Sequence, residues 1–182
     1  GAFVGAYPLD SRFGLSQGFG VYDDGYKRPY SRRSSTVERN AEEVVENALG
    51  WLKTQGEPWF LWLHCYDPHD PYEPPEPFKS RYAKSPYDGE VAYVDFALGK
   101  LLSYLEENRL FNRTLIVLTG DHGESLGDHG ETTHGFFAYN STLWIPLIMD
   151  IPGTKPGRYK DVVGHVDIFP TVCDVLGIPR PS

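Results

Sequence analysis

Metal-binding side chains gather in one short segment after an apolar run in the second half of the chain. Three histidines and two aspartates lie there within fourteen residues: Asp121, His122, Asp128, His129 and His134. The first two are adjacent, and Gly123 lets the backbone bend so that both side chains reach one cation. A carboxylate and an imidazole suit zinc or manganese, whereas calcium requires further oxygen ligands. The segment predicts a metal-binding corner at Asp121 and His122 that other ligands must complete; the alternative is a turn-capping aspartate beside a hydrogen-bonded histidine.

The other two histidines of this segment have less specific interpretations. His134, between Thr133 and Gly135, suits three roles: a third metal ligand, a cation that binds an anionic group, or a turn residue. Its spacing leaves all three open. His129 is interpreted as a histidine that orders its loop.

A second histidine-bearing segment follows another apolar run, Trp59-Phe-Leu-Trp-Leu-His-Cys65. His69 lies between Pro68 and Pro71, which stiffen the backbone around it. A side chain ordered in this way suits a general acid or an anion-binding group, because folding meets the cost of ordering before the substrate arrives. His69 is therefore a candidate for chemistry, with a structural role as the alternative. His64, within the run, is interpreted as structural.

The elements that position these segments are predicted from the period of the apolar residues. Helical periodicity predicts three helices: 37–54 with a capping box from Ser35 to Glu38, 87–108 with an acidic first turn at Asp88 and Glu90, and a helix from an N-cap at Asp167 to Gly177 with Pro170 in its first turn. Apolar runs predict strands at 2–6, 59–65, 114–119 and 146–150, with a helical turn at 136–142. Residues 66–86 hold six prolines and predict a stiff loop without helix or strand.

Helices that alternate with apolar strands predict the α/β class, with a mostly parallel central sheet flanked by helices. The length of 182 residues favours a single domain over 1–182. In such sheets ligands bind beyond the carboxyl ends of the strands. This rule selects the loops after Cys65 and after Thr119, which are the two segments that carry the histidines.

Composition excludes several classes of protein. The net charge of -8 argues against a nucleic-acid partner, because neutralising phosphates requires clustered Lys and Arg. No apolar run reaches the ~18 residues that span a bilayer. The two cysteines, Cys65 and Cys173, cannot form a thiolate zinc cage and are interpreted as small buried apolar side chains.

The start of the chain predicts that a segment precedes it. The chain begins Gly-Ala-Phe-Val, and its only methionine is Met149. We therefore expect an N-terminally incomplete or processed chain, whose exposed sheet edges and apolar faces favour self-association. Export, for example to a periplasm, is expected if the preceding segment supplies a signal peptide.

Several motifs follow one another along the chain: Asp67-Pro-His69-Asp-Pro-Tyr72, Leu118-Thr-Gly-Asp121-His122-Gly-Glu124, Leu126-Gly-Asp-His-Gly130, His134-Gly135, Pro146-Leu-Ile148 and Val166-Asp167-Ile-Phe-Pro170-Thr-Val. In this order and at these separations, they resemble the C-terminal half of the sulfatase family in the alkaline phosphatase superfamily. The resemblance implies a partial alkaline-phosphatase-like fold. It also implies that the full-length protein is a sulfuric ester hydrolase.

The resemblance implies roles for individual residues. Asp121 and His122 would coordinate the active-site divalent cation, which in sulfatases is commonly calcium. His69 would lie near the leaving-group oxygen, and His134 would take the place of a sulfate-binding lysine. The family often has Asn where this chain has His122. A histidine at this position resembles the related phosphodiesterases and phosphonate monoester hydrolases. For those enzymes manganese or zinc is the expected metal.

The chain departs from the family pattern at the nucleophile. The resemblance implies attack on sulfur by a formylglycine made from a Cys/Ser-x-Pro-x-Arg motif, while the metal polarises the sulfate oxygens. Neither Cys65 nor Cys173 begins such a motif, and Asp23-Asp24 lies in the wrong context to supply the early metal ligands. We therefore expect this chain alone to lack turnover. Two alternatives stay open: a phosphate-ester or phosphonate hydrolase on the same scaffold, and a non-catalytic binding module.

Overall fold

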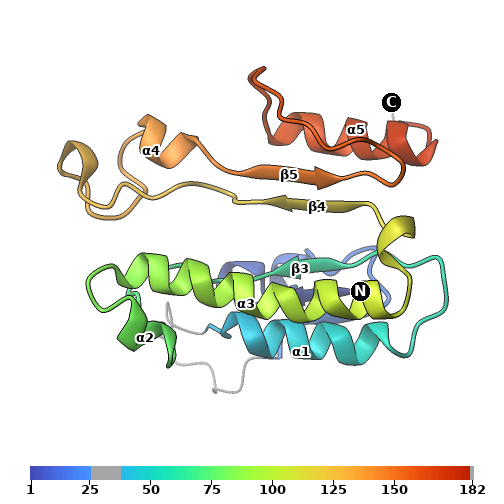
Figure 1. The fold of residues 1–182 in the computed structure, drawn as a ribbon, viewed down its shortest axis with the longest axis horizontal. Coiled ribbons are helices and arrows are strands. Elements are labelled where there is room, and N and C mark those ends of the chain that lie inside the picture. Colours follow the sequence, from blue (N-terminus) through green and yellow to red (C-terminus); the bar gives the residue numbers. More distant parts are fainter. Residues whose placement is uncertain (26–37, 181–182) are drawn as a thin grey trace. The chain divides into compact units, whose positions relative to one another are not determined.

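The computed structural model describes residues 1–25 and 38–180. The chain divides into two compact units, Gly1–Asn108 and Arg109–Ser182, each with its own strands and helices (Figure 1). Both units lie within the range 1–182, over which the length predicted a single domain. The single domain stays a prediction.

The first unit is built on a parallel three-stranded sheet in the order β2-β1-β3. Its strands are β1 (Ala2–Val4), β2 (Tyr22–Asp23) and β3 (Trp62–His64). Phe3 pairs with Asp23 on one side and with Leu63 on the other. β1 and β3 are the predicted strands at 2–6 and 59–65, each shorter than predicted.

Two helices pack on one face of this sheet, α1 (Ala41–Leu52) and α3 (Pro86–Glu107), and they lie side by side (Figure 1). Because successive strand residues point to opposite faces, Phe3 and Leu63 contact the helices. The buried core is formed mainly by small and β-branched side chains at helical spacing: Ala41, Val44, Val45, Ala48 and Leu49 from α1, with Tyr93 and Ala97 from α3. Small side chains at this spacing allow the two helices to approach closely.

An aromatic cluster covers the opposite face of β3. Trp62 points to this face, where Phe19 stacks on its ring with centroids 5.9 Å apart and Tyr22 meets it at 6.4 Å. His64 shares this face by alternation, within β3 as predicted. The parallel sheet is therefore covered on both sides, as the apolar run 59–65 predicted.

Helix α1 begins later than predicted. Ser35 lies outside the described residues, and Glu38 forms an isolated antiparallel bridge with Ala6 instead of a helical turn, so the predicted capping box is wrong. The cap is Asn40, whose side chain accepts the N–H of Glu43 at 2.9 Å. Extended backbone at the bridge excludes a helix there, and the helix starts directly after Asn40.

The proline-rich segment 66–86 is not entirely a loop. It contains the short helix α2 (Phe78–Arg81), and its last residue, Pro86, is the first residue of α3. Proline is tolerated there because the N–H that it lacks would have no partner within the helix. The prediction of a loop is therefore wrong at these positions and holds over 66–77 and 82–85.

The second unit contains an antiparallel strand pair and two helices: β4 (Ile116–Thr119), β5 (Leu147–Asp150), α4 (Asn140–Leu143) and α5 (His165–Leu176). Thr119 pairs with Leu147, so the carboxyl end of β4 meets the start of β5. Short 3-10 turns also occur in the chain, at Tyr7–Leu9, Ser11–Phe13, Phe111–Arg113 and Asp128–Gly130. The antiparallel direction of this pair departs from the mostly parallel sheet that was predicted.

Helix α5 begins before its predicted N-cap. Gly164 is the N-cap, and the carboxylate of Asp167, inside the first turn, accepts the N–H of Gly164 at 2.8 Å. The predicted role of Asp167 as N-cap is therefore wrong, although its carboxylate still satisfies the helix start. Pro170 consequently lies beyond the first turn. Gly177 ends the helix as predicted, in a left-handed conformation with φ of 64°.

The parallel sheet flanked by helices confirms the predicted α/β class. No helix among the described residues has the length and apolar character needed to cross a membrane.

We predict that Asn40→Ala lowers the free energy of unfolding by about 1 kcal/mol, because it removes the acceptor for the Glu43 N–H. Ser85→Ala is the matched control, since Ser85 is the N-cap of α3 but makes no side-chain capping bond. Urea denaturation measures the difference. Equal losses in the two variants would contradict the cap at Asn40.

Candidate functional site

The loop after β4 is fixed at its first residue by a hydrogen bond from α5. The Nε2–H of His165, the first residue of that helix, donates to the carbonyl oxygen of Gly120 at 2.8 Å. A carbonyl oxygen only accepts, so the proton is on Nε2. Because Gly120 directly precedes Asp121, this bond fixes the point at which the predicted metal-binding corner leaves the strand.

Asp121 and His122 form a compact pair at this point. Asp121 Oδ1 accepts the backbone N–H of His122 at 3.0 Å and lies 3.8 Å from His122 Nε2. The Nδ1–H of His122 donates to the carbonyl of Gly123 at 2.9 Å. In the neutral ring the lone pair is therefore on Nε2. A carboxylate oxygen and an imidazole lone pair thus lie next to each other at the end of β4.

Gly123 is required for a different reason than the sequence suggested. It is not one of the glycines with a left-handed backbone, so the predicted special bend is not its role. A Cβ at this position would lie 2.2 Å from the carbonyl oxygen of Ser141, and the Gly123 N–H donates to the carbonyl of Thr142 at 2.8 Å. The loop therefore packs directly on the backbone of α4, and only a residue without a side chain fits there.

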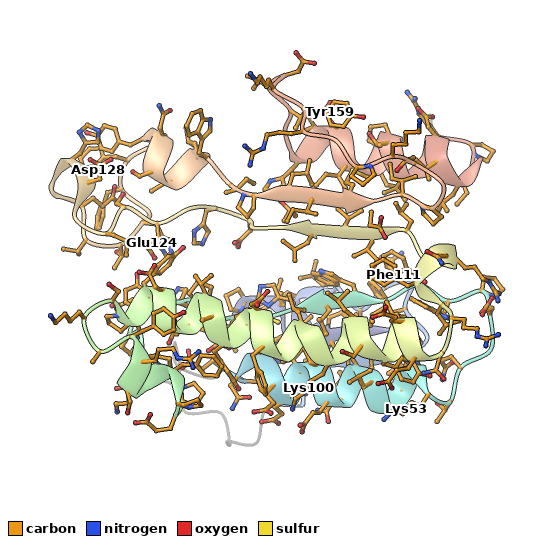
Figure 2. The ribbon with its side chains drawn as sticks, viewed as in Figure 1. Lys53, Lys100, Phe111, Glu124, Asp128 and Tyr159 are labelled. Carbon is orange, nitrogen blue, oxygen red and sulfur yellow. The ribbon has the colours of Figure 1, made fainter. Side chains whose placement is uncertain are left out.

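His134 joins the pair from the far end of the same loop. Its ring packs against that of His122, with centroids 4.0 Å apart and 32° between the planes. Its Nδ1 lies 3.1 Å and 3.2 Å from the two carboxylate oxygens of Glu124. The Glu124 side chain is 4% exposed, and Figure 2 shows it in the loop between β4 and α4. With an ionised carboxylate as the acceptor, Nδ1 carries the proton.

Two further contacts order this loop. The Oε1 of Glu131, a buried side chain, accepts the N–H of Phe136 at 2.9 Å and closes the turn that contains His134. The ring of His129 stacks on Tyr139 with centroids 4.0 Å apart. This contact is of the kind expected for a histidine that orders its loop.

Asp121 and His122 fit a divalent cation that draws further ligands from elsewhere. Their side chains are 81% and 41% exposed, so a cation can reach both. One carboxylate and one imidazole suit manganese or zinc, whereas calcium requires further oxygen ligands. Within residues 1–25 and 38–180, no group of three or more His, Cys, Asp or Glu side chains is arranged to hold a metal ion.

His69 lies in the first unit, in the loop that follows β3. Its ring stacks on Tyr66 with centroids 4.2 Å apart and 19° between the planes. Its Nδ1–H donates to the carbonyl of Asp70 at 2.7 Å, and its backbone N–H donates to Glu90 on α3. Both the ring and the backbone of His69 are therefore held in place.

Neither cysteine has the character of a nucleophile. Both are free thiols, and Cys65 packs against the core formed by α1 and α3. Burial raises the pKa of the Cys65 thiol to about 12, so it stays protonated at neutral pH. Cys173 is buried in α5. The interpretation as a small buried side chain is confirmed for Cys173, whereas Cys65 packs against the core but is only partly buried.

The structure brings together three of the four predicted site residues, Asp121, His122 and His134, all in the second unit. His69 belongs to the first unit. The sequence reasoning missed the two carboxylates that hold these histidines, Glu124 and Glu90.

A signal for Glu90 was present in the sequence. Glu90 is three, four and seven residues before Tyr93, Val94 and Ala97, so it falls on the buried face of α3. A carboxylate on an apolar stripe indicates a buried acceptor rather than a helix-start charge. No comparable signal exists for Glu124, because nine residues separate it from His134 along the loop.

Comparison with known proteins identifies the family. The family model described as Sulfatase matches residues 4–178, which is nearly the whole chain. The chain belongs to the sulfatase family.

Individual relatives match this chain over part of their length. Iduronate 2-sulfatase of Mus musculus is 33% identical over 133 residues, covering 59% of this chain and 24% of that protein. Arylsulfatase K of Homo sapiens is 34% identical over 97 residues, covering 53% and 18%. The phosphonate monoester hydrolase from Silicibacter pomeroyi shares the fold, with a TM-score of 0.69 and 23% identity over 96% of this chain and 47% of that chain. The chain thus spans a quarter or less of these two curated relatives.

These matches confirm the resemblance read from the motifs. The fold is alkaline-phosphatase-like, and its structural neighbours include phosphonate monoester hydrolases. Proteins of this superfamily generally use a divalent metal, and the assignment of Asp121 and His122 as its ligands stays a prediction.

We predict that Gly123→Ala destabilises the second unit by about 1–3 kcal/mol, because the added Cβ overlaps the Ser141 carbonyl. Gly157→Ala is the control in the same unit, since its Cβ would meet only Tyr159, at 4.0 Å. Chemical denaturation followed by circular dichroism compares the two. If both variants were as stable as the parent, the close packing of the loop on α4 would be disproved.

Proposed function

We propose that this chain forms part of a sulfuric ester hydrolase and supplies one corner of its metal site together with two histidines that act on the ester. The observation that carries the proposal is the cluster of Asp121, His122 and His134 at the end of β4 in a chain of the sulfatase family. Ligands in α/β sheets bind at this end of the strands. The proposed substrate is a sulfate ester.

Asp121 and His122 are the proposed metal ligands. When bound, the cation polarises the oxygens of the ester and stabilises the charge that develops on them. The bond from Nδ1 of His122 to the Gly123 carbonyl fixes the tautomer that keeps the Nε2 lone pair available, as backbone carbonyls commonly do for metal-ligating histidines. We propose calcium for a sulfate ester, and manganese or zinc if the substrate is a phosphate ester.

His134 is the proposed anion-binding cation in place of a lysine. Its Nδ1 is engaged by Glu124, so Nε2 is the atom that would donate to an ester oxygen. Packing against His122 keeps this donor beside the metal corner.

His69 is the proposed general acid at the leaving group. Because Nδ1 donates to the Asp70 carbonyl, Nε2 is the atom that would give a proton to the departing oxygen. The stack on Tyr66 keeps the ring in one orientation within its loop.

Hydrolysis of a phosphodiester or a phosphonate monoester is the second candidate. The observation in its favour is His122, a nitrogen ligand that suits manganese or zinc better than calcium. Comparing kcat/KM for an aryl sulfate and an aryl phosphodiester with the complete protein separates the two candidates. A coding sequence before Gly1 without a Cys/Ser-x-Pro-x-Arg motif would instead favour a binding module. Self-association of the chain and export of the protein stay predictions.

We predict that residues 1–182 alone show no turnover of an aryl sulfate, because the chain contains no Cys/Ser-x-Pro-x-Arg motif to supply the nucleophile. The measurement is release of the phenol by the purified chain with calcium or manganese present. Hydrolysis that is abolished by His69→Ala would overturn this prediction.

We predict that Asp121→Asn in the complete protein weakens metal binding by about tenfold or more, because it removes a charged oxygen ligand. Asp128→Asn is the matched control, since Asp128 is an exposed aspartate of the same loop and lies beside His129. Metal content after dialysis, measured by elemental mass spectrometry, compares the two. Equal metal content in both variants would exclude Asp121 as a ligand.

A further inference from the structure

Two carboxylates tie the loop that carries His69 to the helices of the first unit. Asp67 Oδ2 accepts the N–H of Ala41, the first residue of α1, at 2.7 Å. Glu90 Oε2 accepts the N–H of His69 at 3.0 Å, and its Oε1 accepts the N–H of Glu73 at 2.7 Å. The loop is therefore anchored to α1 just before His69, and to α3 at His69 and after it.

Glu90 is part of the packed face of α3. It is 4% exposed and lies on the same face as Tyr93 and Ala97. At the neighbouring Gly89, a Cβ would lie 2.9 Å from the Cγ of Pro74. The loop thus rests directly on the start of α3, where the Glu90 carboxylate reaches its backbone.

The two hydrogen bonds use different oxygens of the carboxylate, and this limits what can replace Glu90. A glutamine has the same shape but presents one oxygen and one NH₂ group. The glutamine oxygen can accept from one of the two N–H groups. Its NH₂ group is itself a donor and would face the other N–H. Only a carboxylate accepts from both His69 and Glu73.

We propose that Glu90 is a positioning residue for His69, which holds the loop in the one place from which the His69 ring can act on a leaving group. The proposal rests on the function proposed above for His69. The stack on Tyr66 and the bond to the Asp70 carbonyl fix the ring within the loop, but both partners move with the loop. Glu90 fixes the loop itself on α3.

The surroundings of Glu90 make this anchor sensitive to pH. Burial, assisted by the nearby carboxylates of Asp67 and Glu38, raises the pKa of Glu90 from its usual 4.5 to about 7, while the N–H groups of His69 and Glu73 lower it. The ionised form, above this pH, accepts the two N–H groups most strongly.

The free energy of unfolding depends on pH in the opposite direction to the strength of this anchor. Because the pKa of Glu90 is higher in the folded chain, the folded state retains a proton that the unfolded state loses between pH 4.5 and about 7. The free energy of unfolding therefore falls through this window as the pH rises. The protonation state that positions His69 best is the one that stabilises the fold least.

Amide hydrogen exchange on the chain tests the anchor directly. In Glu90→Gln we expect exchange at His69 or Glu73, or at both, to accelerate by about tenfold or more at pH 8. Glu76→Gln is the matched control, because Glu76 is an exposed glutamate of the same loop that accepts the N–H of Ser80. It should leave His69 and Glu73 unchanged. Unchanged exchange at both amides in Glu90→Gln, with core amides of α1 still protected, would overturn the proposal.

A pH titration of the unmutated chain by NMR tests the anchor independently, because it does not require a variant that folds. Because the Glu73 N–H donates to Oε1 of Glu90, its chemical shift should titrate with the Glu90 carboxylate, with a midpoint near 7. A Glu73 amide shift that does not respond to the Glu90 carboxylate anywhere between pH 3 and pH 9 would also overturn the proposal.

Kinetics of the complete protein test the consequence for His69. If His69 protonates the leaving group, His69→Ala lowers kcat more for phenyl sulfate, a poor leaving group, than for p-nitrophenyl sulfate. Glu90→Gln should show the same dependence on the leaving group with little change in KM, and Glu76→Gln should show neither effect. A merely structural role for Glu90 would lower both rates equally.

The outcomes separate the two proposals. If His69→Ala shows the leaving-group dependence and Glu90→Gln does not, the positioning role of Glu90 is wrong. If His69→Ala shows none while exchange at His69 or Glu73 accelerates in Glu90→Gln, the proposed function of His69 is wrong and the anchor stands.

Discussion

Carboxylates that accept backbone N–H groups hold the loops that carry the histidines, and the geometry of each candidate site depends on them. A loop that leaves a strand has N–H groups without a ladder partner, and leaving one unpaired in a buried place costs about 1–3 kcal/mol. Glu90 satisfies two such groups in the first unit, and Glu131 satisfies one in the second. These loops are therefore ordered without belonging to a strand or a long helix, and the histidine rings that they carry are held in defined positions.

Burying these carboxylates has an electrostatic cost, which the fold offsets only in part. Burial raises the pKa of Asp67, and the N–H of Ala41 opposes the shift. Because Ala41 is the first residue of α1, the Asp67 charge also lies at the positive end of that helix. Glu90, near the start of α3, accepts two N–H groups of the loop, and burial still raises its pKa to about 7. Burial thus outweighs the backbone N–H groups at both carboxylates.

The sequence predicted what local patterns determine. Three helices, four strands and the adjacent pair Asp121 and His122 all follow from residue types and spacing within a short window. The direction of the β4–β5 pair was not predictable in this way, because an apolar run has the same pattern in a parallel and an antiparallel pair. The true cap of α1 was missed because Ser35 satisfied the capping pattern as well as Asn40 does. The pattern does not reveal that Glu38 pairs with Ala6 in extended backbone.

The partnership of Glu124 with His134 illustrates why the rest of the site required a structure. A lysine is a point charge on a flexible stem, so it can reach an anion from many backbone positions. An imidazole is short and flat, and it donates only along the directions of its two nitrogens. The role proposed for His134 would therefore require an ordered loop and an oriented ring. The turn closed by Glu131 meets the first requirement, and the contacts with Glu124 and His122 meet the second. The residues that order and orient His134 are thus spread along its loop, and no single position in the sequence records them.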